Sequence, residues 1–410
     1  MTKAEQIKNT LQKTRKRRKN QRAVVYQLKL QNLSEKKEKL LKRSFAEAKW
    51  LYNWLVSDIE RLNIPANKVN TVEVKVGESF EERSLTAIGS HIKQEIADRL
   101  KDNLKALAAL KKKHKVGVLK PKKFVNSIPL RQYSQTYKLD FIHNRVRIQK
   151  LGYFRVLGLN QIPEDAEIAN AMLVRKPSGY YLHVTCYLSK EINKEYAREA
   201  IGIDFGIKSK LTLSNGMKID FEVHETPRLK RIQKRLAKTH KNSNNRERTR
   251  LLLDKEYEKI NNRRKEAQNK TIAFLKIYRQ VVYQDDCIKG WESHFGKKVH
   301  SSGIGGLKSR LKHSLETPIP VKRTELTTKE CVICGKRNNL TLADRVMKCD
   351  CGWICDRDIN ASLVILKKGL DLNPEQVVGL GWSELKPLER ITSARVLESN
   401  PYIRVSYLNE

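Results

Sequence analysis

The stretch from Cys349 to Leu366 (CDCGWICDRDINASLVIL) constrains this chain more than any other part of its sequence. It supplies the second pair of thiols for a metal knuckle, and the four candidate ligands are Cys331, Cys334, Cys349 and Cys351. Four thiolates form the closed tetrahedral shell of a structural zinc site. We therefore predict a zinc module here, with Cys355 as the alternative to Cys349 for the fourth ligand.

A carboxylate lies at the N-terminus of the helix predicted to follow this knuckle. Asp358 comes just before an apolar run at helical spacing that ends with Leu366. An acid in this position suits a hard cation such as Mg²⁺, which prefers oxygen ligands. A nuclease that uses two cations needs carboxylates from several separate elements. Asp204, within Gly-Ile-Asp-Phe-Gly on an expected strand, is the second candidate.

The net charge narrows the class of partner. Lys and Arg number 83 against 45 Asp and Glu, which leaves a formal charge of +38 at pH 7. Such a surplus favours a polyanionic partner, and nucleic acid is the obvious one. A membrane-surface protein is the alternative, but no long basic amphipathic helix stands alone in this sequence. No apolar run approaches the roughly 18–20 residues of a membrane span.

The cysteines and the N-terminus set the expected compartment. Seven Cys, an odd number and mostly clustered, argue against a disulfide framework and for an intracellular, metal-binding use. The N-terminus is charged and lacks the apolar region of a secretory signal. We expect a cytoplasmic prokaryotic protein, associated with the nucleoid when it binds DNA. Cys186, within an expected strand, is interpreted as a core thiol, and Cys287 as a free thiol.

The first half of the chain predicts a small β-barrel interrupted by helices. Residues 1–22 are polar and very basic, and we interpret them as a phosphate-binding arm rather than a solvated tail. Short strands separated by Gly and Pro-Ser-Gly turns predict an antiparallel barrel from residues 23–33 and 116–195. Between them, residues 34–115 predict a helical bundle, whose first helix is capped by Ser34.

The second half predicts an α/β domain. Asp204 lies on the first arm of a hairpin whose turn is expected at Asn215-Gly216. Residues 228–270 predict two charged antiparallel helices with a turn near residues 242–245. A buried strand follows and ends in the sequence QVVYQDD. Beyond Lys368 the sequence has few apolar repeats and predicts a C-terminal tail.

Several of these motifs resemble those of the TnpB family, transposon-encoded RNA-guided nucleases related to miniature type V CRISPR effectors. The resemblance covers nearly the whole chain. The segment from Leu130-Arg-Gln-Tyr to Lys150-Leu-Gly-Tyr-Phe resembles the family's wedge barrel. Lys241-Asn-Ser-Asn-Asn-Arg and Asn261-Asn-Arg-Arg resemble its helical insertion. The two cysteine pairs and Cys-Asp-Arg-Asp358 resemble its zinc segment and third nuclease motif.

The resemblance implies a multidomain α/β architecture. An RNase H-like RuvC nuclease domain would occupy residues 196–324 and 356–375, with a zinc-binding module for the target nucleic acid in residues 325–355. Residues 376–410 would form the tail, the barrel would be the wedge domain, and residues 34–115 the recognition domain. The implied function is cleavage of double-stranded DNA beside a short adjacent motif, directed by a transposon-derived guide RNA. The implied cofactors are structural Zn²⁺ and two Mg²⁺, and the RNA–DNA heteroduplex is a further partner.

The second nuclease motif departs from the family pattern. In most members the strand ends in Glu-Asp and the Glu binds metal, whereas this chain has Gln284-Asp285-Asp286. Side chains alternate along a strand, so Gln284 and Asp286 would share a face about 6.6 Å apart, with Asp285 on the other face. Asp285 is the reserve candidate, and the predicted catalytic, Mg²⁺-binding triad is Asp204, Asp286 and Asp358.

Other classes of function stay open. Gln284 is neutral, so the chain could be a nuclease-inactive protein that binds DNA through its RNA. A DNA-binding or transposase-like accessory protein without a guide would leave the cell free of a defined RNA. A CRISPR-associated miniature type V effector would share the chemistry and differ in genomic neighbourhood.

Overall fold

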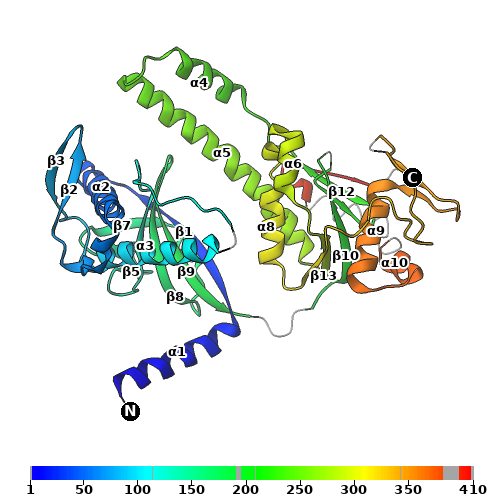
Figure 1. Cartoon of the computed structure of the whole chain (residues 1–410), viewed down its shortest axis with the longest axis horizontal. Helices are drawn as coiled ribbons and strands as arrows, with labels where there is room; N and C mark the ends of the chain where they lie inside the picture. Colours follow the sequence, from blue (N-terminus) through cyan, green and yellow to red (C-terminus); the bar gives the residue numbers. More distant parts are fainter. Residues whose placement is uncertain are drawn as a thin grey trace. The chain divides into compact units, whose positions relative to one another are not determined.

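The computed structural model describes residues 2–112, 114–190, 195–207, 209–341, 343–381 and 397–407. The chain divides into two compact units, Met1–Ile192 and Asn193–Glu410, and each is described by itself (Figure 1). Within the described residues, no helix is long and apolar enough to cross a membrane.

The first unit is built on a seven-stranded antiparallel sheet in the order β4-β8-β9-β1-β7-β6-β5. Its strands are β1 (Gln21–Gln31), β4 (Ser127–Leu130), β5 (Tyr137–Asp140), β6 (Arg145–Ile148), β7 (Gly152–Leu157), β8 (Glu167–Lys176) and β9 (Gly179–Ser189). The outer strand β5 comes back toward β8, since the Tyr137 hydroxyl donates to the Ala169 carbonyl at 3.1 Å. The sheet is therefore a nearly closed barrel, in agreement with the expected short antiparallel strands.

Strand alternation fills this barrel with apolar side chains. Along β9, Leu182, Val184 and Cys186 are fully buried, while the residues between them are partly exposed. Burial raises the pKa of the Cys186 thiol to about 11. Cys186 is thus the core thiol that the sequence predicted.

Two long helices and a hairpin connect β1 to β4. In chain order they are α2 (Glu35–Ser57), β2 (Thr71–Val76), β3 (Ser79–Ser84) and α3 (Ser90–Lys111). Ser34 caps α2 as predicted, because its Oγ accepts the backbone N–H of Lys37 at 3.4 Å. The β2–β3 hairpin turns at Gly77, whose φ is 63°. It interrupts a region predicted to be wholly helical, and the polar, non-alternating sequence of β3 (SFEERS) gave no strand signal.

The predicted basic arm contains a helix, α1 (Lys3–Lys19), with a capping box at its start. Near the end of α1, Arg17 and Arg18 bind the carboxylate of Glu167 on β8, at 2.9 and 2.7 Å. The Arg18 guanidinium also lies 3.3 Å from the centre of the Tyr187 ring. Part of the basic charge therefore holds the helix on the barrel, and phosphate binding by the arm stays a prediction.

The second unit contains a six-stranded mixed sheet in the order β14-β13-β10-β11-β12-β17. Its strands are β10 (Arg198–Phe205), β11 (Leu211–Leu213), β12 (Met217–Phe221), β13 (Tyr278–Gln284), β14 (Pro318–Val321) and β17 (Ile403–Tyr407). β10, β13 and β14 are parallel, and the other neighbouring strands pair antiparallel. The turn predicted at Asn215-Gly216 joins β11 to β12, so the acid-bearing β10 is paired with β11 through an earlier turn.

Helices lie on the sheet of the second unit and extend from it. They are α4 (Pro227–Lys238), α5 (Asn244–Leu275), α6 (Ile288–Phe295), α7 (Lys297–Ser302), α8 (Ile304–Ser314), α9 (Arg357–Leu370) and α10 (Pro374–Gly381). α4 and α5 form the predicted helical pair, which Figure 1 shows extending from the sheet. The turn between them contains Asn242 with a φ of 65°, close to the predicted position.

The predicted C-terminal tail takes part in this sheet. β17 pairs antiparallel with β12 over five residue pairs, and Leu397 and Ile403 are buried in the core. Ile403, Val405 and Tyr407 alternate with polar residues along β17, but a run of five residues is a weak strand signal. Residues 382–396, also assigned to the tail, lie outside the described residues.

α9 covers one face of the mixed sheet, and α5 and α8 cover the other (Figure 1). Successive residues of β10 point to opposite faces, so Ile201 and Ile203 pack with α5 and α8 while Gly202 faces α9. A Cβ on Gly202 would lie 2.2 Å from the carbonyl oxygen of Ser362 on α9. The absent side chain lets α9 lie close to β10.

Gly202→Ala should destabilise the second unit, because the added methyl group meets the backbone of α9. We expect a loss of roughly 1–3 kcal/mol in the free energy of unfolding, as for other overpacked cores. Gly379→Ala in α10 is the matched control, since a Cβ there meets nothing within 4 Å. Urea unfolding that gives both variants the same stability would contradict this close packing.

Candidate active site and zinc site

Four cysteines of the second unit form a compact cluster. The sulfur atoms of Cys331, Cys334, Cys349 and Cys351 all lie within 4.8 Å of one another. The Cys331 and Cys351 sulfurs are 3.6 Å apart, and those of Cys334 and Cys349 are 3.5 Å apart. Zn–S bonds of about 2.3 Å at the tetrahedral angle place sulfurs about 3.8 Å apart. The cluster therefore fits a zinc ion.

Two tight turns shape the cluster. Gly335 (φ 73°) donates its N–H to the Cys331 carbonyl at 3.0 Å, and Gly352 (φ 88°) donates to the Cys349 carbonyl at 2.9 Å. Each turn follows one cysteine pair and bends the chain so that both thiols of the pair point inward. The one-residue spacing of the second pair is thereby accommodated.

Cys355, the alternative ligand, lies outside the cluster. It sits buried on β16 (Ile354–Asp356), which pairs with β15 (Val346–Lys348). Burial raises the pKa of its thiol to about 12, with the charge of Asp356 adding to this effect. Cys355 is thus a core residue, and Cys287 is exposed and also lies outside the cluster.

The purified protein should contain one zinc ion per chain. Cys334→Ser should lose most of it, because three thiolates leave the tetrahedral shell open. Cys355→Ser is the matched control and should keep a full equivalent. Elemental analysis by mass spectrometry measures both, and an equal loss of zinc in the two variants would contradict the ligand set.

The three predicted acids come from three separate parts of the fold, and the charges of two of them raise the pKa of the third. Asp204 lies near the end of β10 and is half-buried. Burial raises its pKa well above the usual range, and the negative charges of Asp358 and Asp286 raise it further, while Arg357 opposes them. The acids acting on Asp204 are the two that the sequence predicted as its partners.

β13 ends at Gln284, and the chain turns immediately afterwards. The N–H of Asp286 donates to the Gln284 carbonyl at 2.9 Å, so strand alternation does not continue to Asp286. The Gln284 side chain is buried and bonded at both ends: Nε2 donates to the Glu325 carbonyl, and Oε1 accepts from Thr327 Oγ1, each at 2.8 Å. Gln284 therefore anchors the strand end.

Asp285 and Asp286 have different surroundings. Asp285 is half-exposed and lies 2.7 Å from Lys308 Nζ on α8, and this hydrogen bond lowers its pKa. Lys308 also donates to the backbone carbonyl of Asp286. Burial raises the pKa of the Asp286 carboxyl to about 6. Among the described residues, this carboxylate has no ion-pair partner within 4 Å, whereas that of Asp285 is paired to Lys308.

The start of α9 holds Asp358 and a second acid that was not assigned from the sequence. Asp356 caps the helix, since its Oδ1 accepts the N–H groups of Asp358 and Ile359 at 3.0 and 3.2 Å. Its Oδ2 accepts from Lys218 Nζ at 2.7 Å. The first Asp of Asp-x-Asp before a helix is a typical N-cap, which is the signal that could have separated the two roles.

Among the described residues, the four cysteines are the group of three or more possible metal ligands that lies close enough together to hold an ion, and the three acids do not form such a group. Two cations about 4 Å apart are held by carboxylates from several sides, so their ligands spread further than those of one ion. Oxygen donors on partly buried carboxylates fit Mg²⁺ in chemistry.

Asp204→Asn should raise the thermal stability of the protein without added Mg²⁺. The pKa of Asp204 is raised in the folded protein. Its buried charged form therefore costs stability once the pH rises above the pKa of Asp in the unfolded chain. We expect a Tm higher by roughly 2–5 °C at neutral pH, shrinking as the pH falls toward 4. Asp285→Asn is the control, because its pKa is lowered by Lys308 and its loss should not stabilise. An equal rise in both variants by calorimetry would contradict the assignment.

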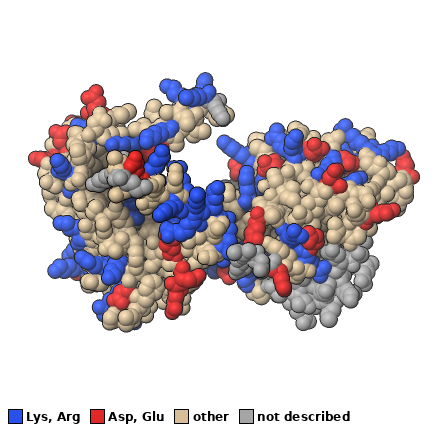
Figure 2. Space-filling view, turned by 90° about the horizontal axis from the view of Figure 1, so that it is seen from below, with Lys and Arg blue, Asp and Glu red and all other residues tan. Residues whose placement is uncertain are grey.

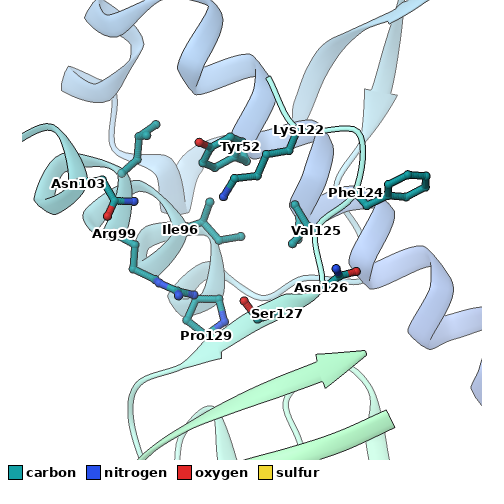
Figure 3. A pocket seen from close by; sticks show the side chains of 12 residues that line it. Tyr52, Ile96, Arg99, Asn103, Lys122, Phe124, Val125, Asn126, Ser127 and Pro129 are labelled. Atoms are coloured by element: carbon teal, nitrogen blue, oxygen red, sulfur yellow. The ribbon is translucent and has the colours of Figure 1, made fainter. Parts of the chain in front are cut away.

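A pocket of about 210 Å³ with two cations lies in the first unit, between α2, α3 and the segment before β4 (Figure 3). Arg99 and Lys122 line it, and none of the described residues that line it is acidic. Lys122 Nζ lies 3.9 Å from the centre of the Tyr52 ring, and burial together with the charge of Arg99 lowers its pKa. Two neighbouring cations without an acid favour an anion such as phosphate.

Basic side chains are abundant elsewhere on the surface. Figure 2 shows Lys and Arg on many parts of the visible face. The twelve residues of α4 alone include Arg228, Lys230, Arg231, Lys234, Arg235 and Lys238. Fold and site together define an α/β protein with a four-cysteine cluster, a set of interacting carboxylates and a basic surface.

Two family models match parts of the chain. The OrfB_IS605 model, described as a probable transposase, matches residues 183–285, which include β10 and β13. A model of the Cas12f1-like TNB domain matches residues 309–365, which include the four cysteines and Asp358. Together with the motifs of the sequence, these matches support a TnpB-like protein.

Curated relatives and a solved structure are also similar. A protein of Streptomyces pristinaespiralis named "Putative RNA-guided DNA endonuclease" is 29% identical over 221 residues, covering 51% of this chain and 55% of the relative. A "Putative transposase" of Acanthamoeba polyphaga mimivirus is 26% identical over 200 residues, or 43% and 41% of the two chains. The matches thus span about half the length of these relatives. A Cas12f1–sgRNA–target DNA complex aligns over 81% of this chain and 83% of its own, at 15% identity and a TM-score of 0.46.

Proposed function

We propose that this protein is an RNA-guided DNA endonuclease. A transposon-derived guide RNA would direct it to double-stranded DNA beside a short adjacent motif. The observation that carries the proposal is the placing of Asp204, Asp286 and Asp358 on three separate elements, where the charges of the other two act on Asp204. The relative named as an RNA-guided DNA endonuclease supports the same class of activity.

The topology of the second unit supports an RNase H-like RuvC domain in residues 196–324 and 356–375. Three strands, β10, β11 and β12, form an antiparallel meander, and β13 and β14 add parallel to β10. Ligands of open α/β sheets bind where parallel strands end, and Asp204 and Asp286 lie at the ends of β10 and β13. The zinc module would lie between the two parts of this domain, in residues 325–355.

The three carboxylates would hold two Mg²⁺ ions. Bound there, the ions would lower the pKa of a water molecule and stabilise the leaving oxygen of the phosphodiester. Burial raises the pKa values of both Asp204 and Asp286, and neighbouring carboxylates raise them further, so that a bound cation would relieve the cost of their anionic forms. Asp285 would keep its salt bridge to Lys308 and serve as an anchor. Arg357, 3.5 Å from Asp358, would orient that carboxylate.

The basic surface would hold the nucleic acids. With a charge of +38, backbone contacts to RNA and to the RNA–DNA heteroduplex would supply much of the affinity. In the first unit, the pocket between Arg99 and Lys122 would take a phosphate of the bound nucleic acid. Base pairing with the guide would supply sequence specificity. The barrel would then correspond to the wedge domain and α2 and α3 to the recognition domain.

A nuclease-inactive, RNA-guided DNA-binding protein is the second candidate. The observation that favours it is Gln284, which replaces an expected acid and is bonded to Glu325 and Thr327. Such a protein would keep the basic surface and the zinc module and would bind target DNA without cutting it.

Cleavage of a plasmid library by the protein with its copurifying RNA distinguishes the two. In the presence of Mg²⁺, Asp204→Ala, Asp286→Ala and Asp358→Ala should each lower the cleavage rate by at least about 10³-fold, because each removes a metal ligand. Asp285→Ala is the matched control and should lose less than about tenfold, since its salt bridge is only an anchor. Tight target binding by the wild type without any cleavage would refute the nuclease and establish the inactive binder.

A further inference from the structure

A buried amide on α9 contacts both halves of the cysteine cluster. Asn360 is fully buried, and its Oδ1 accepts the backbone N–H of Val332 at 3.2 Å and the indole N–H of Trp353 at 3.1 Å. Its Nδ2 donates to the Glu330 carbonyl at 2.7 Å. Val332 lies between the two cysteines of the first pair, and Trp353 follows the second pair. One side chain thus bonds to both knuckles.

Asn360 also stands two residues after Asp358 in the first turn of α9. On the other side of Asp358, Arg357 donates from Nη1 to the Thr341 carbonyl at 2.9 Å, within the same zinc-bearing segment. Further along the helix, Lys367 donates to the Val332 carbonyl at 3.0 Å. The residues flanking the proposed metal-binding acid are therefore bound to the segment that carries the cysteines.

An amide that uses both its oxygen and its nitrogen in a dry site has a single acceptable orientation. The positions of Val332 and Trp353 follow from the ligand cysteines next to them. Because Asn360 is part of a rigid helix, a displacement of these partners must be transmitted to the first turn of α9 or leave buried polar groups unpaired. Partners beyond the ligand shell commonly change metal affinity by about 10–100-fold.

We infer that Asn360 is a positioning residue that couples the cysteine cluster to the carboxylate site, so that the folded knuckle fixes the place of Asp358. This inference rests on the proposed roles of the cysteines and of Asp358. Loss of zinc would release Val332 and Trp353 from their fixed positions. The first turn of α9 would then become mobile, and Asp358 with it.

The test compares Asn360→Ala with Ser362→Ala in the full-length protein carrying its RNA. Ser362 is equally buried on α9, but its hydroxyl bonds within the helix, to the Ile359 carbonyl at 2.7 Å. Two readouts are independent of cleavage. Zinc release to a chromogenic chelator reports on the cluster. Mn²⁺ affinity measured by electron paramagnetic resonance reports on the carboxylate site, and the Asp204→Asn variant measures the Mn²⁺ that binds elsewhere.

Asn360→Ala should release zinc faster and bind Mn²⁺ about tenfold more weakly, and Ser362→Ala should do neither. Removal of zinc from the wild type should weaken Mn²⁺ binding by a similar factor. Removal of zinc from Asn360→Ala should weaken its Mn²⁺ binding little further. Trp353→Phe removes the indole hydrogen bond to Asn360 and leaves the bonds of Asn360 to Val332 and Glu330. It should give a smaller loss of the same kind, and it serves as the test if Asn360→Ala does not fold.

Faster zinc release with unchanged Mn²⁺ affinity would overturn the inference, because Asn360 would then serve the cluster alone. An equal loss of Mn²⁺ affinity in Ser362→Ala would also overturn it, since the cause would be a general weakening of α9. If the wild type shows the coupling but never cuts DNA, the coupling stands and the proposed nuclease activity fails.

Discussion

The close packing of α9 on β10 is the constraint on which the second unit depends. Gly202 has no side chain where the backbone of Ser362 passes, and a Cβ there would lie 2.2 Å from its carbonyl oxygen. Two residues along the strand from this contact stands Asp204, and four residues back along the helix stands Asp358. The same contact that closes the core therefore brings two acids from distant parts of the sequence together.

That arrangement has an electrostatic cost. Burial and neighbouring negative charge raise the pKa values of Asp204 and Asp286. The carboxylates of Asp285 and Asp356, by contrast, form salt bridges with Lys308 and Lys218. Among the described residues, the three acids proposed to bind metal have no lysine partner, and Asp358 lies 3.5 Å from Arg357 instead. Strained charge at a functional site is a common consequence of selection for activity over stability.

The displaced second motif follows from how β13 ends. Gln284 stays in the strand, and its amide is hydrogen-bonded to the Glu325 carbonyl and to Thr327, so it cannot turn toward Asp204 without breaking both bonds. The turn that follows places Asp286 beyond the strand, held through its carbonyl by Lys308. The chain therefore reaches the acid site with a residue outside the regular strand.

Local pattern was enough to predict much of this protein. The alternating strands of the barrel, the Ser34 cap, the core thiol of Cys186 and the TnpB-like motifs all depend on neighbouring residues, so their spacing is visible in the sequence. The β2–β3 hairpin and β17 were not predicted, although β2 (TVEVKV) and β17 (IRVSY) alternate, because both strands are short and the partner strand β3 (SFEERS) is polar. The sequence also did not decide whether Cys349 or Cys355 is the fourth ligand, and it did not show that Asp285 and Asp286 have different surroundings. These depend on distances between residues far apart in the chain, which only the tertiary packing of β16, α8 and α9 decided.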